Sequence, residues 1–458
     1  MKITFSSFAF GCRVNEAEKE ALDRKMLEAG FSFSEKNPDI FIINTCAVTH
    51  KAEREVRNLI YQIKRKNPKT KIVVTGCSAT YWQKNKLYDQ LPIDLLVDNI
   101  NKEFLVELLK KRLFLSNQAS PILSTEYKLT SKFLSSRRLL VKIQDGCQRF
   151  CTFCIVPYLR GLPKSRKIEE IVEEINNHYY SVIPNLFRDL NSDKILNQVK
   201  NEIKTQRPIS EIILTAINTE AFGLDTGESF IDLIEKVLEK TKVPRLSFGS
   251  IHPWSITPQF INFYQKISTE NRLVNFFHIP LQSGSDTILK LMKRGYATEE
   301  ILEKLYGLQK INPLSLLATD VIVGFLGETE KEFEKTYSFL EKSPLVKFHI
   351  FRFSKRKNTA AYYMAKNIKE PTEEEKKKRA KALAELSAKK YLNFLEKNIG
   401  RTSNALILNK EKNGFYEALL DNQLPILIEK EKDLKAGEIV KAKVKKIKNG
   451  KLMGKEVL

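Results

Sequence analysis

Leu139-Leu140-Val141-Lys142-Ile143-Gln144-Asp145-Gly146 runs directly into Cys147-Gln148-Arg149-Phe150-Cys151-Thr152-Phe153-Cys154. The apolar run at 139–144 predicts a buried strand, and the loop after it carries three cysteines with the spacing C-x3-C-x2-C. Three thiolates in one short loop can hold three irons of a 4Fe-4S cluster and leave the fourth iron open. A zinc site would need a fourth protein ligand and a ferredoxin site a fourth thiolate, so both fit this loop less well.

The strand at 139–144 is the first of six strands that alternate with helices. The other strands are predicted at 211–215, 245–250, 275–279, 318–324 and 346–351, and helices at 167–177, 230–240, 285–293, 298–310 and 330–340. Repeated βα units with six strands predict a partial (βα)6 barrel over 133–370, with its active site at the carboxyl ends of the strands. The connection at 179–208 is much longer than the usual few residues and predicts a surface insertion.

Residues 1–115 form a separate α/β pattern. Strands are predicted at 3–10, 39–44 and 71–75, and helices at 16–29, 51–66 and 102–111, which together imply a parallel sheet. Cys12, Cys46 and Cys77 each come just after one of these strands. Because open α/β sheets bind ligands at this edge, the three thiols are expected to converge on one metal centre.

The chain ends in a basic segment. A charged helix is predicted at 372–390, and short β-like runs follow at 404–408, 414–419, 425–429, 438–447 and 452–458. The pattern predicts a small β-barrel over 394–458. Lys and Arg total 77 against 55 Asp and Glu in the whole chain, a net charge of +22, which favours a polyanionic partner such as nucleic acid.

Composition excludes several classes of protein. Hydrophobic residues make up 42% and charged residues 29%, as in ordinary globular proteins, and no run of 18 apolar residues predicts a membrane span. The first ten residues run into Gly11 without a signal-peptide cleavage site, so we expect a cytoplasmic protein with no membrane partner. Six cysteines in such a chain are more consistent with metal ligands than with disulfides.

The cysteine loop resembles the signature of radical S-adenosylmethionine enzymes, and the chain as a whole resembles their methylthiotransferase branch. The segments that carry this resemblance are Gly11-Cys12-Arg13-Val14-Asn15, Asn44-Thr45-Cys46-Ala47-Val48-Thr49, Gly76-Cys77, Lys142-Ile143-Gln144-Asp145-Gly146-Cys147, Cys154-Ile155-Val156-Pro157-Tyr158-Leu159-Arg160-Gly161, His278-Ile279-Pro280-Leu281-Gln282-Ser283-Gly284-Ser285 and Asp320-Val321-Ile322-Val323-Gly324-Phe325-Leu326-Gly327-Glu328-Thr329. Residues 400–458 are similar to the TRAM RNA-binding barrel, with Gly450, Leu452 and Gly454 in its closing motif.

The resemblance implies two 4Fe-4S clusters and S-adenosylmethionine as cofactors. Cys147, Cys151 and Cys154 would hold the cluster whose open iron binds S-adenosylmethionine, and Cys12, Cys46 and Cys77 would hold an auxiliary cluster. Glycines after an apolar strand also allow a ligand to approach the backbone closely, as at Gly324 and Gly327. The cofactor pocket implied by the resemblance consists of Phe153, Thr215, Asn218, Ser250, Gln282, Ser283, Gly324, Gly327 and Glu328.

The reaction implied by the resemblance modifies tRNA. One S-adenosylmethionine would methylate sulfur at the auxiliary cluster, and another would give a radical that abstracts hydrogen from C2 of an adenosine, where the methylthio group is then installed. An unactivated aryl C–H bond needs such cofactor-borne radical chemistry. The basic barrel would contact phosphates of the anticodon stem-loop, and the electron donor and sulfur source would be further partners of unknown identity.

Three substrates compete within the family: threonylcarbamoyladenosine in tRNA, isopentenyladenosine in tRNA, and an aspartate of a ribosomal protein. The segments around Cys12 and Cys46 look most like the threonylcarbamoyladenosine branch, with isopentenyladenosine as the runner-up. From another class, the chain could be a non-catalytic iron-sulfur RNA-binding protein, although a purely structural cluster has no reason to leave one iron open.

Some residues depart from the family pattern or have open roles. Ile251-His252-Pro253 lacks the usual acidic residue, and the segment at 351–359 lacks a glycine before Thr359. His252 and His278 lie near strand ends, where a structural role fits them better than that of a general base. Arg160 and Arg166 could meet either a cofactor carboxylate or an RNA phosphate.

Overall fold

The computed structural model describes residues 3–113, 132–180, 208–270, 272–409 and 411–457. By its contacts the chain divides into two compact units. The first comprises Met1–Ser131, Asp145–Pro163 and Ser354–Thr359, and the second comprises Lys132–Gln144, Lys164–Phe353 and Ala360–Leu458. Both sets of three cysteines therefore lie in the first unit.

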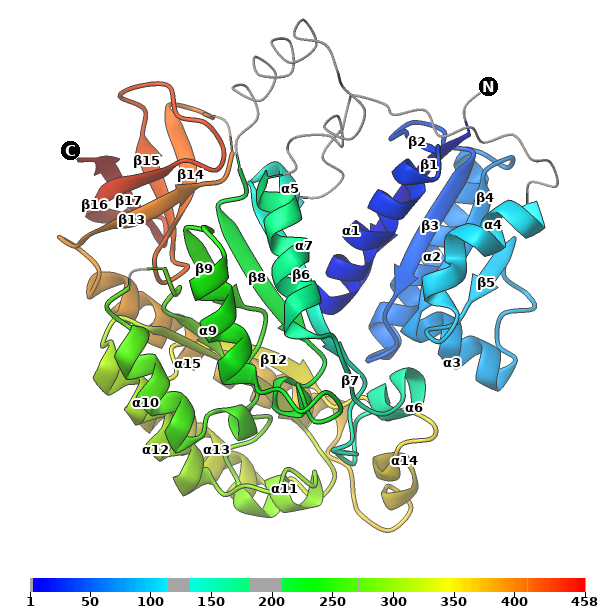
Figure 1. Ribbon diagram of the computed structural model, residues 1–458. Coiled ribbons are helices and arrows are strands. Elements are labelled where there is room, and N and C mark those ends of the chain that lie inside the picture. The colour runs from blue at the N-terminus through cyan, green and yellow to red at the C-terminus, as the bar shows by residue number, and fades with distance from the viewer. Residues whose placement is uncertain (1–2, 114–131, 181–207, 271, 410, 458) are drawn as a thin grey trace, which may run out of the picture. The chain divides into compact units, whose positions relative to one another are not determined.

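The first unit is built on a parallel sheet, shown in blue and cyan in Figure 1. Its strand order is β2-β1-β3-β4-β5, with bounds Ser32–Phe33, Thr4–Ala9, Ile40–Thr45, Lys71–Gly76 and Leu95–Val97. The helices are α1 (Arg13–Glu28), α2 (His50–Lys66), α3 (Cys77–Asn85) and α4 (Leu105–Leu113), with a short 3-10 turn at Lys102–Phe104. The predicted parallel sheet is confirmed, and its central strands β1, β3 and β4 end just before the three cysteines.

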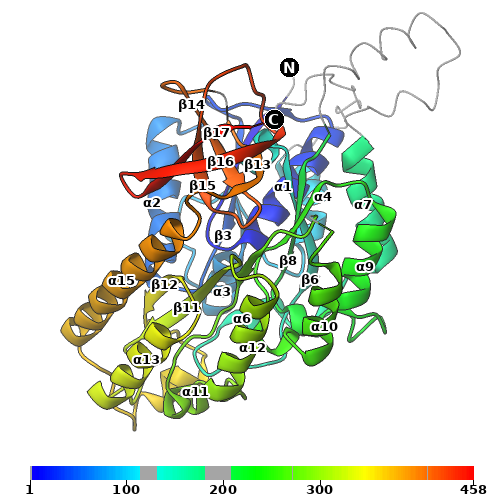
Figure 2. The same cartoon turned by 90° about the vertical axis from the view of Figure 1, so that its left-hand side faces the viewer.

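The second unit contains the predicted series of βα units, in green and yellow in Figures 1 and 2. Its strands are ordered β7-β6-β8-β9 and β10-β11-β12, and backbone hydrogen bonds between Leu246 and the segment at 272–274 connect the two groups. The strand bounds are Lys164–Ser165 (β7), Arg138–Asp145 (β6), Glu211–Ala216 (β8), Arg245–Phe248 (β9), Phe276–His278 (β10), Leu316–Val323 (β11) and Lys347–Arg352 (β12). The ladders β6-β8-β9 and β10-β11-β12 are parallel, as a partial barrel requires.

Helices cover these strands through one continuous apolar core. Their bounds are Ile168–Tyr180 (α7), Phe230–Lys240 (α9), Pro258–Ile267 (α10), Asp286–Leu291 (α11), Thr298–Ile311 (α12), Glu330–Lys342 (α13), Ala360–Met364 (α14) and Glu373–Glu396 (α15), with α5 at Lys132–Ser135 and 3-10 turns at Thr219–Ala221 and Pro253–Ser255. Ser229 and Thr372 begin α9 and α15 with complete capping boxes, which satisfy backbone N–H groups that a helix start leaves free.

The basic end of the chain folds as predicted into a closed barrel of order β13-β14-β15-β17-β16. The strand bounds are Thr402–Ile407, Phe415–Leu420, Pro425–Glu429, Lys451–Glu456 and Ile439–Lys448. The barrel is anchored to the amino ends of β8 and β9, where the buried Arg245 donates to the carbonyls of Leu419 and Leu420 and Gln423 donates to Glu211 at 2.6 Å. In Figure 1 it appears in orange and red beside those strand ends.

The structure differs from the sequence prediction in local elements. The prediction missed α10, which begins with Thr257 as its cap and Pro258 at its first position, and the helix α3 directly after Gly76. The starts of these helices are marked by single residues, the cap and proline of α10 and the glycine before α3, and not by a periodic pattern of apolar residues. Most of the predicted insertion at 179–208 lies outside the described residues.

Asn358 explains how the chain tolerates the missing glycine before Thr359. Its φ angle is +74°, in the left-handed region where glycine is favoured. Asparagine is the side chain that adopts this region most readily, and the turn is closed by Thr359 Oγ1 donating to the carbonyl of Arg356 at 2.7 Å. The backbone geometry is therefore kept without the glycine.

Candidate active site

The sheet edge of the first unit brings Cys12, Cys46 and Cys77 together. Cys12 precedes α1, Cys46 follows β3, and Cys77 opens α3. Gly11 has a φ of +91°, and a side chain there would place a Cβ 2.6 Å from Cβ of Cys46, so the close approach requires glycine. Burial, together with the neighbouring Cys77 and Cys12, raises the pKa of the Cys46 thiol to about 12. The thiols thus lie close enough to affect one another's ionisation, as predicted from their strand ends.

The donor set of this edge suits an iron-sulfur cluster. Three sulfur ligands bind soft metal centres, and they do so as deprotonated thiolates. Metal binding would therefore release protons from these thiols.

The second set of cysteines lies in a tightly turned loop. Cys147 N–H donates to the carbonyl of Gly161 at 3.1 Å, and Cys154 N–H donates to the carbonyl of Cys151 at 2.9 Å. Gly146 has a φ of +73°, and a Cβ there would collide with the carbonyl of Leu162. Cys147 and Cys154 are partly exposed and Cys151 is buried. Three thiols from one loop can hold three irons, and this loop offers no fourth cysteine.

Arg160 connects the segment after this loop to the first cysteine set. It ends helix α6 (Val156–Arg160), and its side chain is 1% exposed. Its Nε lies 3.3 Å from Sγ of Cys77, and its other nitrogens donate to oxygens of Asn15 (2.7 Å), Glu18 (2.9 Å) and Asp145 (2.8 Å). Burial opposes the charge, but Glu18, Cys77 and Asp145 outweigh it and raise the pKa of Arg160 well above its usual value.

Both arginines, whose roles the sequence left open, have partners within the protein. Arg160 contacts the carboxylates of Glu18 and Asp145 and the sulfur of Cys77. Arg166 donates to Glu174 at 2.5 Å and to the carbonyl of Lys142 at 3.1 Å, so it too is paired within the protein.

Three of the predicted cofactor residues lie at the carboxyl ends of β8 and β9 in the second unit. Thr215 is buried at the end of β8 against Gly249, where a Cβ would stand 2.8 Å from its hydroxyl oxygen. Asn218 follows the same strand, is 1% exposed, and its N–H donates to Gln144 Oε1 at 2.9 Å. Ser250 follows β9, and its hydroxyl lies 2.7 Å from Nδ1 of His278.

Gln282 and Ser283 follow β10 in the second unit. Gln282 has a φ of +81° and exchanges backbone hydrogen bonds with β11, so its backbone is fixed beside Val321. Ser283 is fully buried and its hydroxyl lies 3.2 Å from that of Thr336 on α13, on the helix side of the sheet.

Gly324, Gly327 and Glu328 form the turn between β11 and α13. Both glycines have a φ of +75°. Glu328 Oε1 accepts from the N–H of Gly324 at 2.8 Å and from Arg379 at 2.9 Å, and burial raises the pKa of this carboxyl despite those donors. The turn is thus held rigid by the protein's own contacts. Phe153, the remaining predicted pocket residue, is half-buried and belongs to the first unit.

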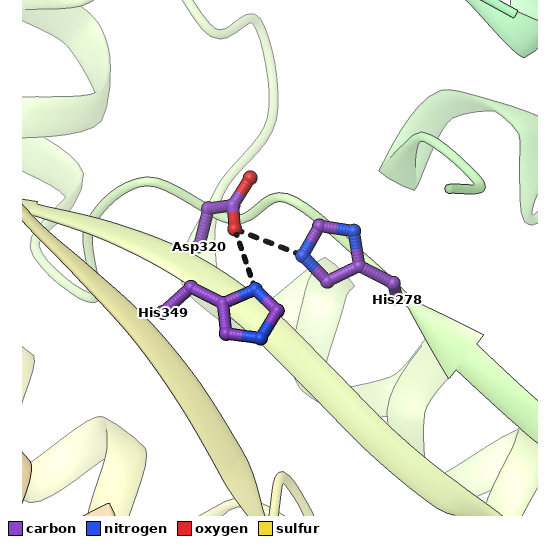
Figure 3. A group of neighbouring side chains, drawn as sticks. All are labelled: His278, Asp320 and His349. Atoms are coloured by element: carbon purple, nitrogen blue, oxygen red, sulfur yellow. Dashed lines mark hydrogen bonds and ion pairs between the residues drawn. The ribbon is translucent and has the colours of Figure 1, made fainter. Parts of the chain in front are cut away.

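A polar group on β10, β11 and β12 brings together three side chains, of which the sequence analysis weighed only His278 (Figure 3). His278 Nε2 lies 2.8 Å from Asp320 Oδ1, and His349 Nδ1 lies 3.3 Å from the same oxygen. Burial disfavours the carboxylate, but the two histidine hydrogen bonds hold the pKa of Asp320 well below its usual range. Asp320 and His349 are register partners, a pairing visible only once β11 and β12 are aligned. His252, by contrast, lies near Thr219 Oγ1 at 3.3 Å and outside this group.

Comparison with known proteins identifies similar chains over nearly the full length. Residues 4–98 match the uncharacterized protein family UPF0004, and residues 141–340 match the radical SAM superfamily. The chain is 31% identical to threonylcarbamoyladenosine tRNA methylthiotransferase MtaB of Aquifex aeolicus, over 90% of this chain and 94% of that one. It is 30% identical to the Bacillus subtilis protein of the same name, over 97% and 94% of the two chains.

A relative with a different stated substrate is equally similar. The tRNA-2-methylthio-N(6)-dimethylallyladenosine synthase of Petrotoga mobilis is 30% identical over 98% of both chains. Among solved structures, the fold is similar to that of the radical S-adenosylmethionine methyltransferase TsrM from Kitasatospora setae, with a TM-score of 0.50 and 12% identity over 77% of this chain and 75% of that one. Within the described residues, no helix has both the length and the apolar character needed to span a bilayer.

Proposed function

The chain belongs to the radical S-adenosylmethionine methylthiotransferase family, and from this premise we propose that it attaches a methylthio group to C2 of N6-threonylcarbamoyladenosine next to the anticodon of tRNA. The observation that carries the proposal is the arrangement of all six cysteines as two sets of three within one compact unit. A purely structural iron-sulfur protein would have no use for two incomplete ligand sets.

Two 4Fe-4S clusters and S-adenosylmethionine are the proposed cofactors. Cys12, Cys46 and Cys77 would hold the auxiliary cluster, and Cys147, Cys151 and Cys154 the other. When bound, these groups supply the sulfur-transfer and radical chemistry that the C2–H bond requires. The proposed cofactor residues are Phe153, Thr215, Asn218, Ser250, Gln282, Ser283, Gly324, Gly327 and Glu328; of these, Glu328 and the two glycines hold the β11–α13 turn in shape.

The chain's own residues would position the reacting groups. Arg160 holds the segment after the cysteine loop against Cys77 and carries one of the hydrogen bonds to that sulfur. In the barrel, strand β16 exposes Lys441 and Lys443 on one face while Ala442 and Val444 are buried, and the exposed Lys445 follows where the register shifts. We propose that this face contacts tRNA phosphates, because alternate lysines on a strand present a row of positive charge.

We further propose the division of labour that the sequence predicts: residues 1–115 for the auxiliary cluster, 133–370 for the radical chemistry, and 394–458 for tRNA binding. The proposed location is the cytoplasm, where tRNA is modified, and an electron donor and a sulfur source would be needed as partners. The names of the relatives support the threonylcarbamoyladenosine substrate, and dimethylallyladenosine is the alternative because relatives with both names are about equally similar.

The test is mass spectrometry of tRNA nucleosides from cells with the gene, without it, and with a Cys151→Ala variant. The proposal expects methylthio-threonylcarbamoyladenosine to disappear in the latter two, with its unthiolated precursor accumulating. Loss of methylthio-dimethylallyladenosine instead would overturn the substrate assignment, and unchanged nucleosides in all three strains would overturn the tRNA reaction.

A further inference from the structure

We propose that His278, Asp320 and His349 form a binding site for the polar N6 substituent of the substrate nucleoside. The site would bind a ureido N–H on Asp320 and a carboxylate on His349, the two groups that distinguish a threonylcarbamoyl substituent from an apolar dimethylallyl substituent. This inference rests on the proposed function and assigns its substrate selectivity to specific atoms.

The three side chains differ in which of their polar atoms are already hydrogen-bonded. His278 uses both ring nitrogens, with Ser250 on Nδ1 at 2.7 Å and Asp320 on Nε2 at 2.8 Å. Asp320 uses only Oδ1, which both histidines approach, and Figure 3 shows the other carboxylate oxygen directed away from the two rings. Within the described parts of the chain, Asp320 Oδ2 and His349 Nε2 have no hydrogen-bond partner.

The two free atoms complement each other in hydrogen-bonding character, and both belong to partly exposed side chains. Asp320 Oδ2 can only accept hydrogen bonds, because its two histidine contacts keep the carboxyl ionised. His349 Nδ1 donates to that carboxylate, and when the ring is protonated its Nε2 carries a second N–H for an anionic acceptor. The side chain of His349 is 44% exposed and that of Asp320 is 21% exposed, so a ligand can reach both atoms.

Strand geometry adds an aromatic surface beside this pair. Phe351 is two residues beyond His349 on β12, so both side chains leave the same face of the sheet. It is 45% exposed although it is large and apolar. An exposed aromatic ring next to hydrogen-bonding groups is the usual means by which proteins hold an unstacked nucleobase.

A metal ion is the competing occupant, since the three ligand atoms lie within 4.8 Å of one another. However, the three facing atoms already satisfy one another by hydrogen bonds at 2.8 and 3.3 Å. The atoms left for a ligand, Asp320 Oδ2 and His349 Nε2, are directed away from the hydrogen bonds within the group (Figure 3), so they remain available to an organic molecule. The shared carboxylate also fixes both rings, so the site is organised before the ligand arrives.

The test compares two substitutions of similar size at one position. His349→Phe keeps a flat ring and removes the donor, whereas His349→Gln keeps an amide N–H close to the place of Nε2. Both full-length, cluster-loaded variants are titrated with anticodon stem-loop oligonucleotides that contain threonylcarbamoyladenosine, dimethylallyladenosine or unmodified adenosine. Iron content and melting temperature establish that each variant is folded and loaded.

We expect His349→Phe to weaken binding of the threonylcarbamoyl oligonucleotide about 10- to 100-fold, the usual effect of losing a hydrogen bond to a charged group. Binding of the unmodified oligonucleotide and the KM for S-adenosylmethionine should stay unchanged, and His349→Gln should recover most of the affinity. Asp320→Asn should also lose selectivity, because an NH2 donor takes the place of the free acceptor Oδ2.

Three outcomes for His349→Phe would overturn the inference. Its affinity for the threonylcarbamoyl oligonucleotide could be unchanged, its affinity for all three oligonucleotides could fall equally, or only its KM for S-adenosylmethionine could change. If added zinc alone restored selectivity to a variant, a metal site would take the place of the proposed hydrogen-bonding site. The wild type separates this result from the proposed function, because a wild-type enzyme that modifies only the dimethylallyl oligonucleotide refutes the proposed substrate before any variant is compared.

Discussion

Replacing Arg160 by Gln should destabilise the first unit strongly. The substitution removes a side chain that is 1% exposed and leaves Glu18, which is 7% exposed, without one of its cations. Removing one partner of a buried ion pair usually lowers the free energy of unfolding by about 3–5 kcal/mol. Glu18 keeps Lys102 at 2.6 Å and Asp145 is 26% exposed, so we expect the lower end of that range, about 3 kcal/mol.

Hydrogen exchange followed by mass spectrometry is the suitable assay, because it reports the opening of one unit separately from the other. A loss of about 3 kcal/mol in the stability of the first unit should speed hydrogen exchange of the buried amides of β3 and β4 about a hundredfold. The matched control is Arg166→Gln, which removes an arginine that is 32% exposed in the second unit and should change exchange of these strands little. Adding Glu18→Gln to Arg160→Gln should restore part of the loss, since the buried negative charge is then removed as well.

The same variant should also alter the auxiliary cluster that we propose at Cys12, Cys46 and Cys77. In a background with Cys147, Cys151 and Cys154 replaced by Ala, loss of the positive charge and N–H donor beside Cys77 should lower the reduction potential of the remaining cluster. Exchange of β3 and β4 within threefold of the wild type, together with an unchanged potential, would refute the role assigned to Arg160.

Three further predictions concern other parts of the chain. Burial raises the folded-state pKa of Glu328 above its ordinary value of 4.5. The wild type should therefore lose stability relative to Glu328→Gln as pH rises from about 4.5 through that raised pKa. Melting temperatures of both proteins at several pH values measure this, and the same pH dependence in both would contradict it. Lys443→Gln should lower the slope of log affinity for tRNA against log salt by about 1, and an unchanged slope would remove Lys443 from the phosphate contacts. Asn358→Gly should change the free energy of unfolding by less than about 1 kcal/mol, whereas Asn358→Ala should destabilise by about 1 kcal/mol; equal effects in chemical denaturation would argue against the left-handed turn as the reason for asparagine.

Much of the fold could be predicted because it depends on local periodicity. The strands around 40–45, 71–76 and 316–323 are rich in apolar residues, and helix α9 was predicted with its observed bounds. The convergence of Cys12, Cys46 and Cys77 followed from parallel strands ending at one edge, a rule that needs no side-chain detail. Short elements escaped prediction, since β5 has three residues and α3 begins at a glycine turn with a φ of +92°.

Polar contacts between distant segments could not be predicted in the same way. Arg160 pairs with Glu18, 142 positions away in the chain, and its charge alone was equally consistent with a phosphate or a cofactor partner. Ser283 carries a hydroxyl at a strand end, yet the structure directs it towards Thr336 on the helix side. Which face such a side chain takes depends on backbone geometry that residue type does not encode.

The group on β10, β11 and β12 shows how strongly function can depend on strand register. Asp320 faces His349 only because Ala318 pairs with Lys347 at the start of the ladder and the alignment continues without a bulge to Val323 and Arg352. A slip of one residue would send His349 to the opposite face and put Phe348 or Ile350 beside the carboxylate. The apolar residues that bury the far face, including the buried Phe348, therefore fix the histidine's position. Substrate selectivity, if it resides at His349, is set by core packing behind the strand as much as by the histidine itself.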